Sequence, residues 1–129
     1  MKFKYEGLEI WQLAVDYVAQ YYRLMAKLPE HERFGLASQG RRAAVSIALN
    51  VAEGSGRKTD RDFSLFVNRA ITSLLETDAV AKIAIRLGYI SERDYSALEP
   101  LMKTEYYKLV AFDKALQKKA GQRRRYSEE

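Results

Sequence analysis

The sequence predicts an all-α protein folded as an antiparallel up-down-up-down four-helix bundle. Apolar residues recur at spacings of three and four in four successive segments, which is the period of an α-helix with one buried face. No run of alternating apolar and polar residues is long enough to predict a strand. The connections between the segments are short, and short connections place successive helices antiparallel. At 129 residues, the chain is long enough for one domain with its own core.

The first helix, over residues 8–28, carries two apolar stripes and ends before Pro29, because proline restricts the residue before it. The first seam consists of Leu8, Trp11, Val15, Val18, Tyr22 and Met25, and the second seam consists of Ile10, Ala14, Tyr17, Tyr21, Leu24 and Leu28. Together they form an apolar arc wider than one bundle face needs, which predicts self-assembly. The pattern does not decide which seam faces the core. Tyr17 and Tyr21 are the candidate interface residues.

The second helix is expected to begin between residues 34 and 38 and to run to about Glu53. Small residues along it predict close packing against another helix. The glycines of Gly54-Ser55-Gly56 favour a sharp exit with positive φ.

The third helix is expected to begin at Thr59 or Asp60 and to end at Gly88. The fourth begins at Ser91, and Pro100 predicts a kink or a late start. The bundle is expected to occupy residues 1–120, followed by a basic, flexible tail over residues 121–129.

Polar residues form one stripe on the second helix and a matching stripe on the third. Such stripes are either solvated faces or the two sides of a subunit boundary. For the second alternative, Arg42 with Glu76 and Arg69 with Glu53 are the expected ion pairs, because a desolvated charge needs a partner. The candidate interface residues from these stripes are Gln39, Arg42, Ser46, Asn50, Glu53, Arg69, Ser73 and Glu76.

The net charge of +5 is concentrated near the C-terminus. From Lys114 onward there are six basic and two acidic residues, a surplus of four. A second basic group stands where the third helix begins, beside unpaired backbone N–H groups that favour a phosphate. The candidate nucleic-acid contacts are Arg57, Lys58, Arg61, Lys118, Lys119, Arg123, Arg124 and Arg125. A basic helix end that only aids solubility is the alternative.

Several short motifs occur in a fixed order between residues 8 and 90. They are residues 8–12 (LEIWQ), 34–36 (FGL), 38–39 (SQ), 41–47 (RRAAVSI), 50–57 (NVAEGSGR), 75–77 (LET) and 87–90 (LGYI). Together they resemble the four-helix-bundle proteins encoded in intervening sequences of bacterial 23S ribosomal RNA genes. The resemblance implies a small bacterial cytoplasmic protein that assembles into a ring, a homopentamer, with no established catalytic activity. It also implies a fold similar to the accessory variability protein of diversity-generating retroelements, a pentameric barrel that binds nucleic acid and a reverse transcriptase.

No catalytic, metal or cofactor site is predicted. The chain has no cysteine, so thiolate ligands are excluded, and this composition fits a reducing cytoplasm. The one histidine, His31, lies between two glutamates in an expected loop, whereas a di-iron bundle needs two Glu-x-x-His motifs. Residues 54–59 lack the spacing and the preceding strand of a phosphate-binding P-loop. No signal peptide or membrane span is expected.

Two functions remain after these exclusions. The first is weak contact with the RNA or DNA backbone, without sequence readout, because no reading helix or zinc finger is present. The second is an oligomeric scaffold for a protein partner, for which tyrosines would supply contact surface.

Overall fold

The computed structural model describes the backbone of residues 1–128 and the side chains of residues 1–123. In this part of the chain, every regular element is helical and no strand occurs. The elements are η1 (Lys4–Gly7), α1 (Glu9–Met25), η2 (Glu30–Glu32), α2 (Leu36–Ser55), α3 (Asp60–Arg86), α4 (Glu92–Ser96) and α5 (Glu99–Glu128). The prediction of an all-α fold is confirmed.

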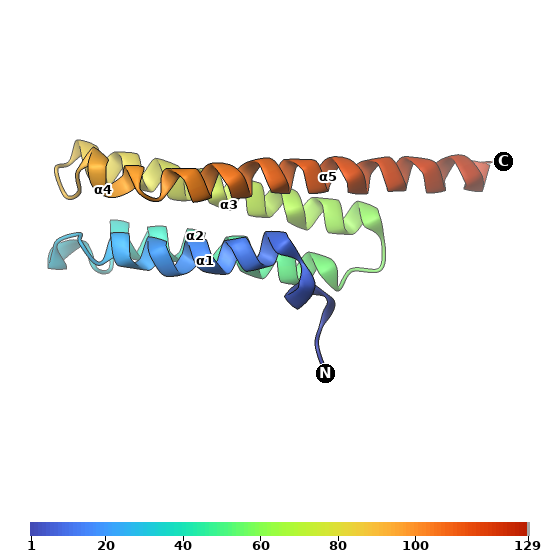
Figure 1. Ribbon diagram of the computed structural model, residues 1–129, viewed down its shortest axis with the longest axis horizontal. Coiled ribbons are helices and arrows are strands. Elements are labelled where there is room, and N and C mark those ends of the chain that lie inside the picture. Colours follow the sequence, from blue (N-terminus) through green and yellow to red (C-terminus); the bar gives the residue numbers. More distant parts are fainter. Residues whose placement is uncertain (129) are drawn as a thin grey trace.

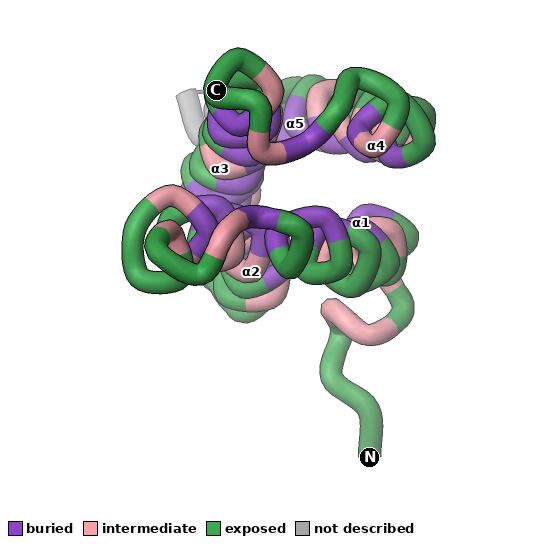
Figure 2. Tube along the Cα trace, turned by 90° about the vertical axis from the view of Figure 1, so that its left-hand side faces the viewer, coloured by how far each residue is buried: buried purple, intermediate pink, exposed green. Residues whose placement is uncertain are grey.

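Four long helices form the bundle. Helix α2 packs against α1 and α3, and α5 packs against α3 and α1. Figure 1 shows α1 beside α2 and α3 beside α5, with short connections at the two ends of the bundle. The buried parts of the helices lie on their facing sides (Figure 2). Over the described residues, no helix is long and apolar enough to cross a membrane.

The helix ends follow local chemistry. Thr59 caps α3 by accepting a hydrogen bond from the backbone N–H of Asp62 at 3.1 Å. Ser91 and Asp94 form a capping box at the start of α4. Pro100 is the second residue of α5, so the fourth predicted helix is divided into α4 and α5, and the late start is confirmed.

Gly88 ends α3 with a φ of +77°, and it is the one residue with a positive φ in the part of the chain that is described. The expected positive φ after α2 is therefore wrong. Gly54 lies within α2, and Gly56 has a φ of −88°.

The division between bundle and tail at residue 121 stays a prediction, although no helix end marks it. Helix α5 continues through Gly121 and ends at Glu128 (Figure 1). Glycine weakens a helix by about 1 kcal/mol relative to alanine but does not stop one. The expected flexibility of residues 121–129 stays a prediction.

The second seam of α1 forms the centre of the core. All six of its residues are buried, and Tyr17 and Tyr21 are 0 % exposed. The Tyr17 hydroxyl lies 2.8 Å from Thr77 Oγ1, and the Tyr21 hydroxyl donates to the Thr77 carbonyl at 2.8 Å. Burial raises the pKa of Tyr17 to about 12 and raises the pKa of Tyr21 further. The prediction that Tyr17 and Tyr21 contact another subunit is therefore wrong.

The expected close packing of α2 is confirmed where α2 meets α3. Gly54 is buried at this contact, and a Cβ atom there would lie 2.7 Å from Phe66 Cβ and 2.8 Å from Phe63 Cδ1. Both phenylalanines are buried in α3, so neither ring has free space to move into. Any side chain at position 54 would push the two helices apart.

We predict that Gly54→Ala destabilises the protein by about 1 to 3 kcal/mol, because the added methyl group overlaps the Cβ atom of Phe66 and the ring of Phe63. Urea unfolding followed by circular dichroism measures the change. Gly121→Ala is the matched control: a Cβ there meets nothing within 4 Å, so the change is expected to leave stability equal or higher. A Gly54→Ala protein as stable as the wild type would contradict the predicted helix contact.

Candidate assembly surface and nucleic-acid interface

The first seam of α1 is only partly covered by the core. Val15 is 40 % exposed and Tyr22 is 43 % exposed. Leu8, Trp11 and Val18 are half-buried against the edge of the core, and only Met25 is fully buried. The two seams are separated by rotation about the helix, so burying the second seam turns the first one outward.

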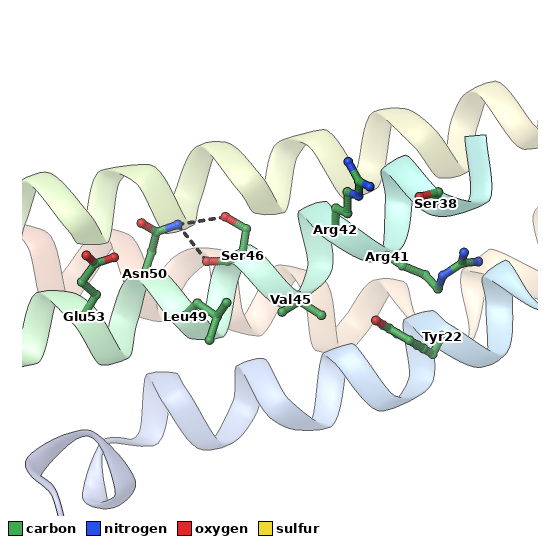
Figure 3. Close-up of a pocket in the computed structure, with 9 residues that line it drawn as sticks. All are labelled: Tyr22, Ser38, Arg41, Arg42, Val45, Ser46, Leu49, Asn50 and Glu53. Atoms are coloured by element: carbon green, nitrogen blue, oxygen red, sulfur yellow. Dashed lines mark hydrogen bonds between the residues drawn. The ribbon is translucent and has the colours of Figure 1, made fainter. Parts of the chain in front are cut away.

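The first seam continues onto α2 across a groove. Tyr22 of α1 lines this groove opposite Val45 and Leu49 of α2 (Figure 3). Leu49 is 61 % exposed, although it is as apolar as any core residue. This apolar strip from two helices is the candidate assembly surface.

The two predicted polar stripes meet within one protomer. Ser46 Oγ of α2 lies 2.9 Å from Ser73 Oγ of α3, and Gln39 Nε2 donates to Glu76 Oε1 at 3.4 Å. Asn50 donates to the Ser46 hydroxyl at 2.9 Å (Figure 3). The stripes border the α2–α3 contact on the outer side of the bundle. Their role in an interface between copies stays a prediction.

The charged members of the stripes have partners different from those expected between subunits. Glu53 pairs with Arg57 at 3.4 Å. The Arg69 guanidinium lies 4.8 Å from the centre of the Phe66 ring, and the Arg57 guanidinium lies 4.4 Å from it. Arg42 is exposed, and it lines a second hollow, between α2 and α3, that Glu76 also lines.

The basic residues that were predicted in two separate segments lie at one end of the bundle. Arg123 of α5 approaches Asp60 of α3 to 3.4 Å, beside Arg61. The Asp60 oxygen involved has no hydrogen-bond partner, so this contact is an ion pair without hydrogen-bond geometry. We call this end of the bundle the basic end; it comprises Arg57, Lys58, Arg61, Lys118, Lys119 and Arg123, all exposed.

The charges of the basic end differ in their neighbours. Arg57 pairs with Glu53, and Arg123 pairs with Asp60. Among the side chains that are described, Lys58, Arg61, Lys118 and Lys119 form no ion pair. The side chains of Arg124 and Arg125, also predicted to bind nucleic acid, lie outside the described residues.

Helix α5 is held on α3 by a polar network that the sequence analysis missed. Asp113 is buried and accepts hydrogen bonds from the Ser64 hydroxyl, from Asn68 Nδ2 at 3.0 Å and from Gln117 Nε2 at 2.8 Å. These bonds compensate for the loss of water around the carboxylate. They place the basic part of α5 next to the start of α3.

A signal for this network exists in the sequence. Asp113 stands between Leu109 and Leu116 on the apolar stripe of α5, where a charge is unusual. Glu105 interrupts the same stripe one turn before Leu109, and it is also buried.

His31 lies in the connection between α1 and α2 and is exposed, and its Nε2 atom lies 3.2 Å from the Tyr89 hydroxyl. That hydroxyl donates to Glu32 at 3.0 Å. In the part of the chain with described side chains, no group of three or more acidic or histidine residues could hold a metal ion.

Comparison with known proteins identifies the family of this chain. The family model of the 23S rRNA-intervening sequence proteins matches residues 6–111, which include α1 to α4 and the first part of α5. The chain belongs to this family. The resemblance inferred from the sequence motifs is thus confirmed. No match was found among curated proteins.

A solved structure shares the fold of this 23S rRNA-intervening sequence protein. It is the crystal structure of a protein of unknown function from the S23 ribosomal protein family of Bacteroides thetaiotaomicron. The TM-score is 0.74 at 22 % sequence identity, over 81 % of this chain and 98 % of that one. At this identity the likeness shows the bundle fold alone.

We predict that Asp113→Ala in this 23S rRNA-intervening sequence protein destabilises the fold by about 1 to 3 kcal/mol, because buried donors lose their acceptor. Amide hydrogen exchange should also become faster over residues 113–123. Lys114→Ala removes an exposed neighbour and is the control. Equal exchange in the two variants would show that Asp113 does not hold α5.

Proposed function

We propose that this chain is a non-catalytic, cytoplasmic subunit of a homo-oligomeric ring of up-down-up-down four-helix bundles. The ring binds the phosphate backbone of RNA or DNA weakly and without sequence readout. Support for assembly comes from the first seam, where Val15 and Tyr22 are exposed on a helix whose other apolar face is fully buried. The number of five copies rests on the family resemblance.

Self-association is the expected consequence of an exposed apolar strip of this length. Val15, Tyr22 and Leu49 are all at least 40 % exposed, and half-buried residues of α1 extend the strip along the helix. Burying such a surface stabilises a contact by about 25 cal/mol for each Å² of apolar area. A second copy of the chain offers an equally apolar surface. Leu65 and Leu75 of α3 are exposed leucines that could form the apolar surface on the second copy.

The observation that carries the nucleic-acid proposal is the meeting of two basic segments at one end of the bundle. Lys58, Arg61, Lys118 and Lys119 leave their charges available for phosphates, whereas Arg57 and Arg123 share theirs with Glu53 and Asp60. In a ring each copy repeats this basic end, so the local positive potential grows with the number of copies. Simultaneous contacts then raise the affinity above that of one subunit.

The assembly is tested by placing two charges in the first seam. We predict that Val15→Asp with Tyr22→Asp converts the oligomer into a smaller species that keeps its helical circular dichroism, because both side chains are exposed in the protomer. Sedimentation velocity measures the size. Gln20→Asp with Ala111→Asp adds the same charge at exposed sites outside the seam and is expected to leave the oligomer intact.

Two outcomes would contradict the assigned interface. One is an unchanged sedimentation coefficient for the seam variant, and the other is equal dissociation of the control variant. Tyr17→Asp with Tyr21→Asp is expected to unfold the protomer instead, because both residues are fully buried.

Nucleic-acid binding is tested by salt titration. We predict that fluorescence anisotropy with RNA and with duplex DNA detects micromolar binding that weakens steeply between about 50 and 200 mM salt. Replacing Arg61, Lys118 and Lys119 by alanine should lower both the affinity and the salt slope.

The control variant replaces Arg86, Arg93 and Lys103, which are exposed at the opposite end of the bundle, by alanine. It removes the same charge and is expected to bind like the wild type. Equal losses in the two triple variants would show that the net charge, and not the basic end, attracts the nucleic acid. A flat anisotropy at low salt would remove the nucleic-acid role and leave the scaffold for a protein partner. The exposed Tyr107 and Phe34 favour that second role.

A further inference from the structure

Glu105 is the least compensated polar group in the described part of the protein. It stands on α5 in the interior of the bundle, and it is 0 % exposed. Neither of its carboxylate oxygens has a hydrogen-bond partner. Asp113, two turns later on the same helix, is also buried but accepts three hydrogen bonds. A buried carboxylate without donors is strongly disfavoured in its charged form.

Among the residues with described side chains, no basic group on a neighbouring helix compensates for Glu105. Helix α1 presents Glu9, whose charge opposes that of Glu105, and Glu9 is itself paired with Lys108 of α5 at 3.1 Å. On α4, Asp94 pairs with Lys27 and not with α5. Among the described side chains, Lys108 is therefore the cation that acts on Glu105, and it already has a partner in Glu9.

Helix α3 offers Glu105 only apolar surface. The contacts of Ser64 with Asp113 and of Asp78 with Tyr95 bracket the part of α3 that faces this stretch of the chain. Between them, the buried residues of α3 are Phe66, Val67, Ala70, Leu74 and Thr77, while its charged residues Arg69 and Glu76 are exposed. Thr77 is engaged by Tyr17 and by the Leu74 carbonyl.

We propose that Glu105 is a proton-controlled latch between α5 and α1, closed while its carboxyl group is neutral and loosened when that group loses its proton. The contact between α1 and α5 is the place where the latch acts, because Glu9 and Lys108 join these two helices beside it. Loosening this contact separates α1 from α5 locally, while the hydrogen bonds of Tyr17 and Tyr21 with Thr77 still hold α1 on α3.

The direction of the pH dependence follows from the burial of Glu105. Burial, together with the charge of Glu9, raises its pKa from 4.5 to about 8, and Lys108 opposes part of this rise. The folded protein therefore holds a proton that the unfolded chain releases at lower pH. The contribution of Glu105 to the free energy of unfolding is therefore largest below about pH 4.5 and falls as the pH rises toward 8. Within that window the unfolding equilibrium constant rises by up to about tenfold for each pH unit.

The test compares the wild type with Glu105→Gln and Glu105→Met in urea unfolding between pH 5 and pH 9. Both variants are neutral at every pH, and methionine also removes the unpartnered polar atoms. Between pH 5 and pH 9, we expect the unfolding equilibrium constant of the wild type to change by a factor at least ten times larger than that of either variant. If one variant fails to fold, the other provides the comparison.

Opening of the latch has its own readout in Trp11, the one tryptophan of the chain, which lies on α1 next to Tyr5. Acrylamide quenching of its fluorescence is expected to rise in the wild type as the pH passes 8 and to stay constant in Glu105→Gln. Glu9→Gln removes the charge that raises the pKa of Glu105, so the pH midpoint of the quenching change should be lower in this variant than in the wild type. Equal pH profiles for the wild type and Glu105→Gln, in unfolding or in quenching, would overturn the proposal.

Discussion

The hydrogen bonds of Tyr17 and Tyr21 with Thr77 fix the rotation of α1, and the arrangement of the outer surface depends on that rotation. Both apolar seams of α1 could cover a core by composition alone. Only the second has hydroxyl groups that reach a polar partner inside α3, and a buried hydroxyl without a partner would cost about 1 to 3 kcal/mol. The first seam is therefore turned outward, where it joins Val45 and Leu49 of α2.

The two long pairs of helices are joined by different means. Helices α2 and α3 approach closely because Gly54 leaves room for Phe63 and Phe66, and the serines Ser46 and Ser73 meet on the outer side. Helix α5 is held on α3 by the bonds to Asp113, whereas Glu105, near α1, has no such bonds. In the described part of the chain, the buried carboxylate of Asp113 is thus hydrogen-bonded, whereas that of Glu105 has no hydrogen-bond partner.

Periodicity and turn residues predicted the fold well because they act locally. The caps at Thr59 and Ser91, the stop at Gly88 and the late start near Pro100 all depend on residues close in sequence. The choice between the seams of α1 depends on Thr77, sixty residues after Tyr17, so periodicity alone could not make it. The basic residues were predicted individually. That the two basic segments meet at one end follows from how far α5 extends along α3, which the periodicity did not define. Glu105 and Asp113 were missed because a charge on an apolar stripe was not read as buried.

We propose that the first seam of α1, left partly exposed when the tyrosines are buried, is covered by another copy of the chain. Light scattering of the native protein on a size-exclusion column measures this directly. We expect a particle mass near five times the 14.9 kDa of one chain. A particle of 14.9 kDa at micromolar concentration, with Val15 and Tyr22 left in water, would contradict it.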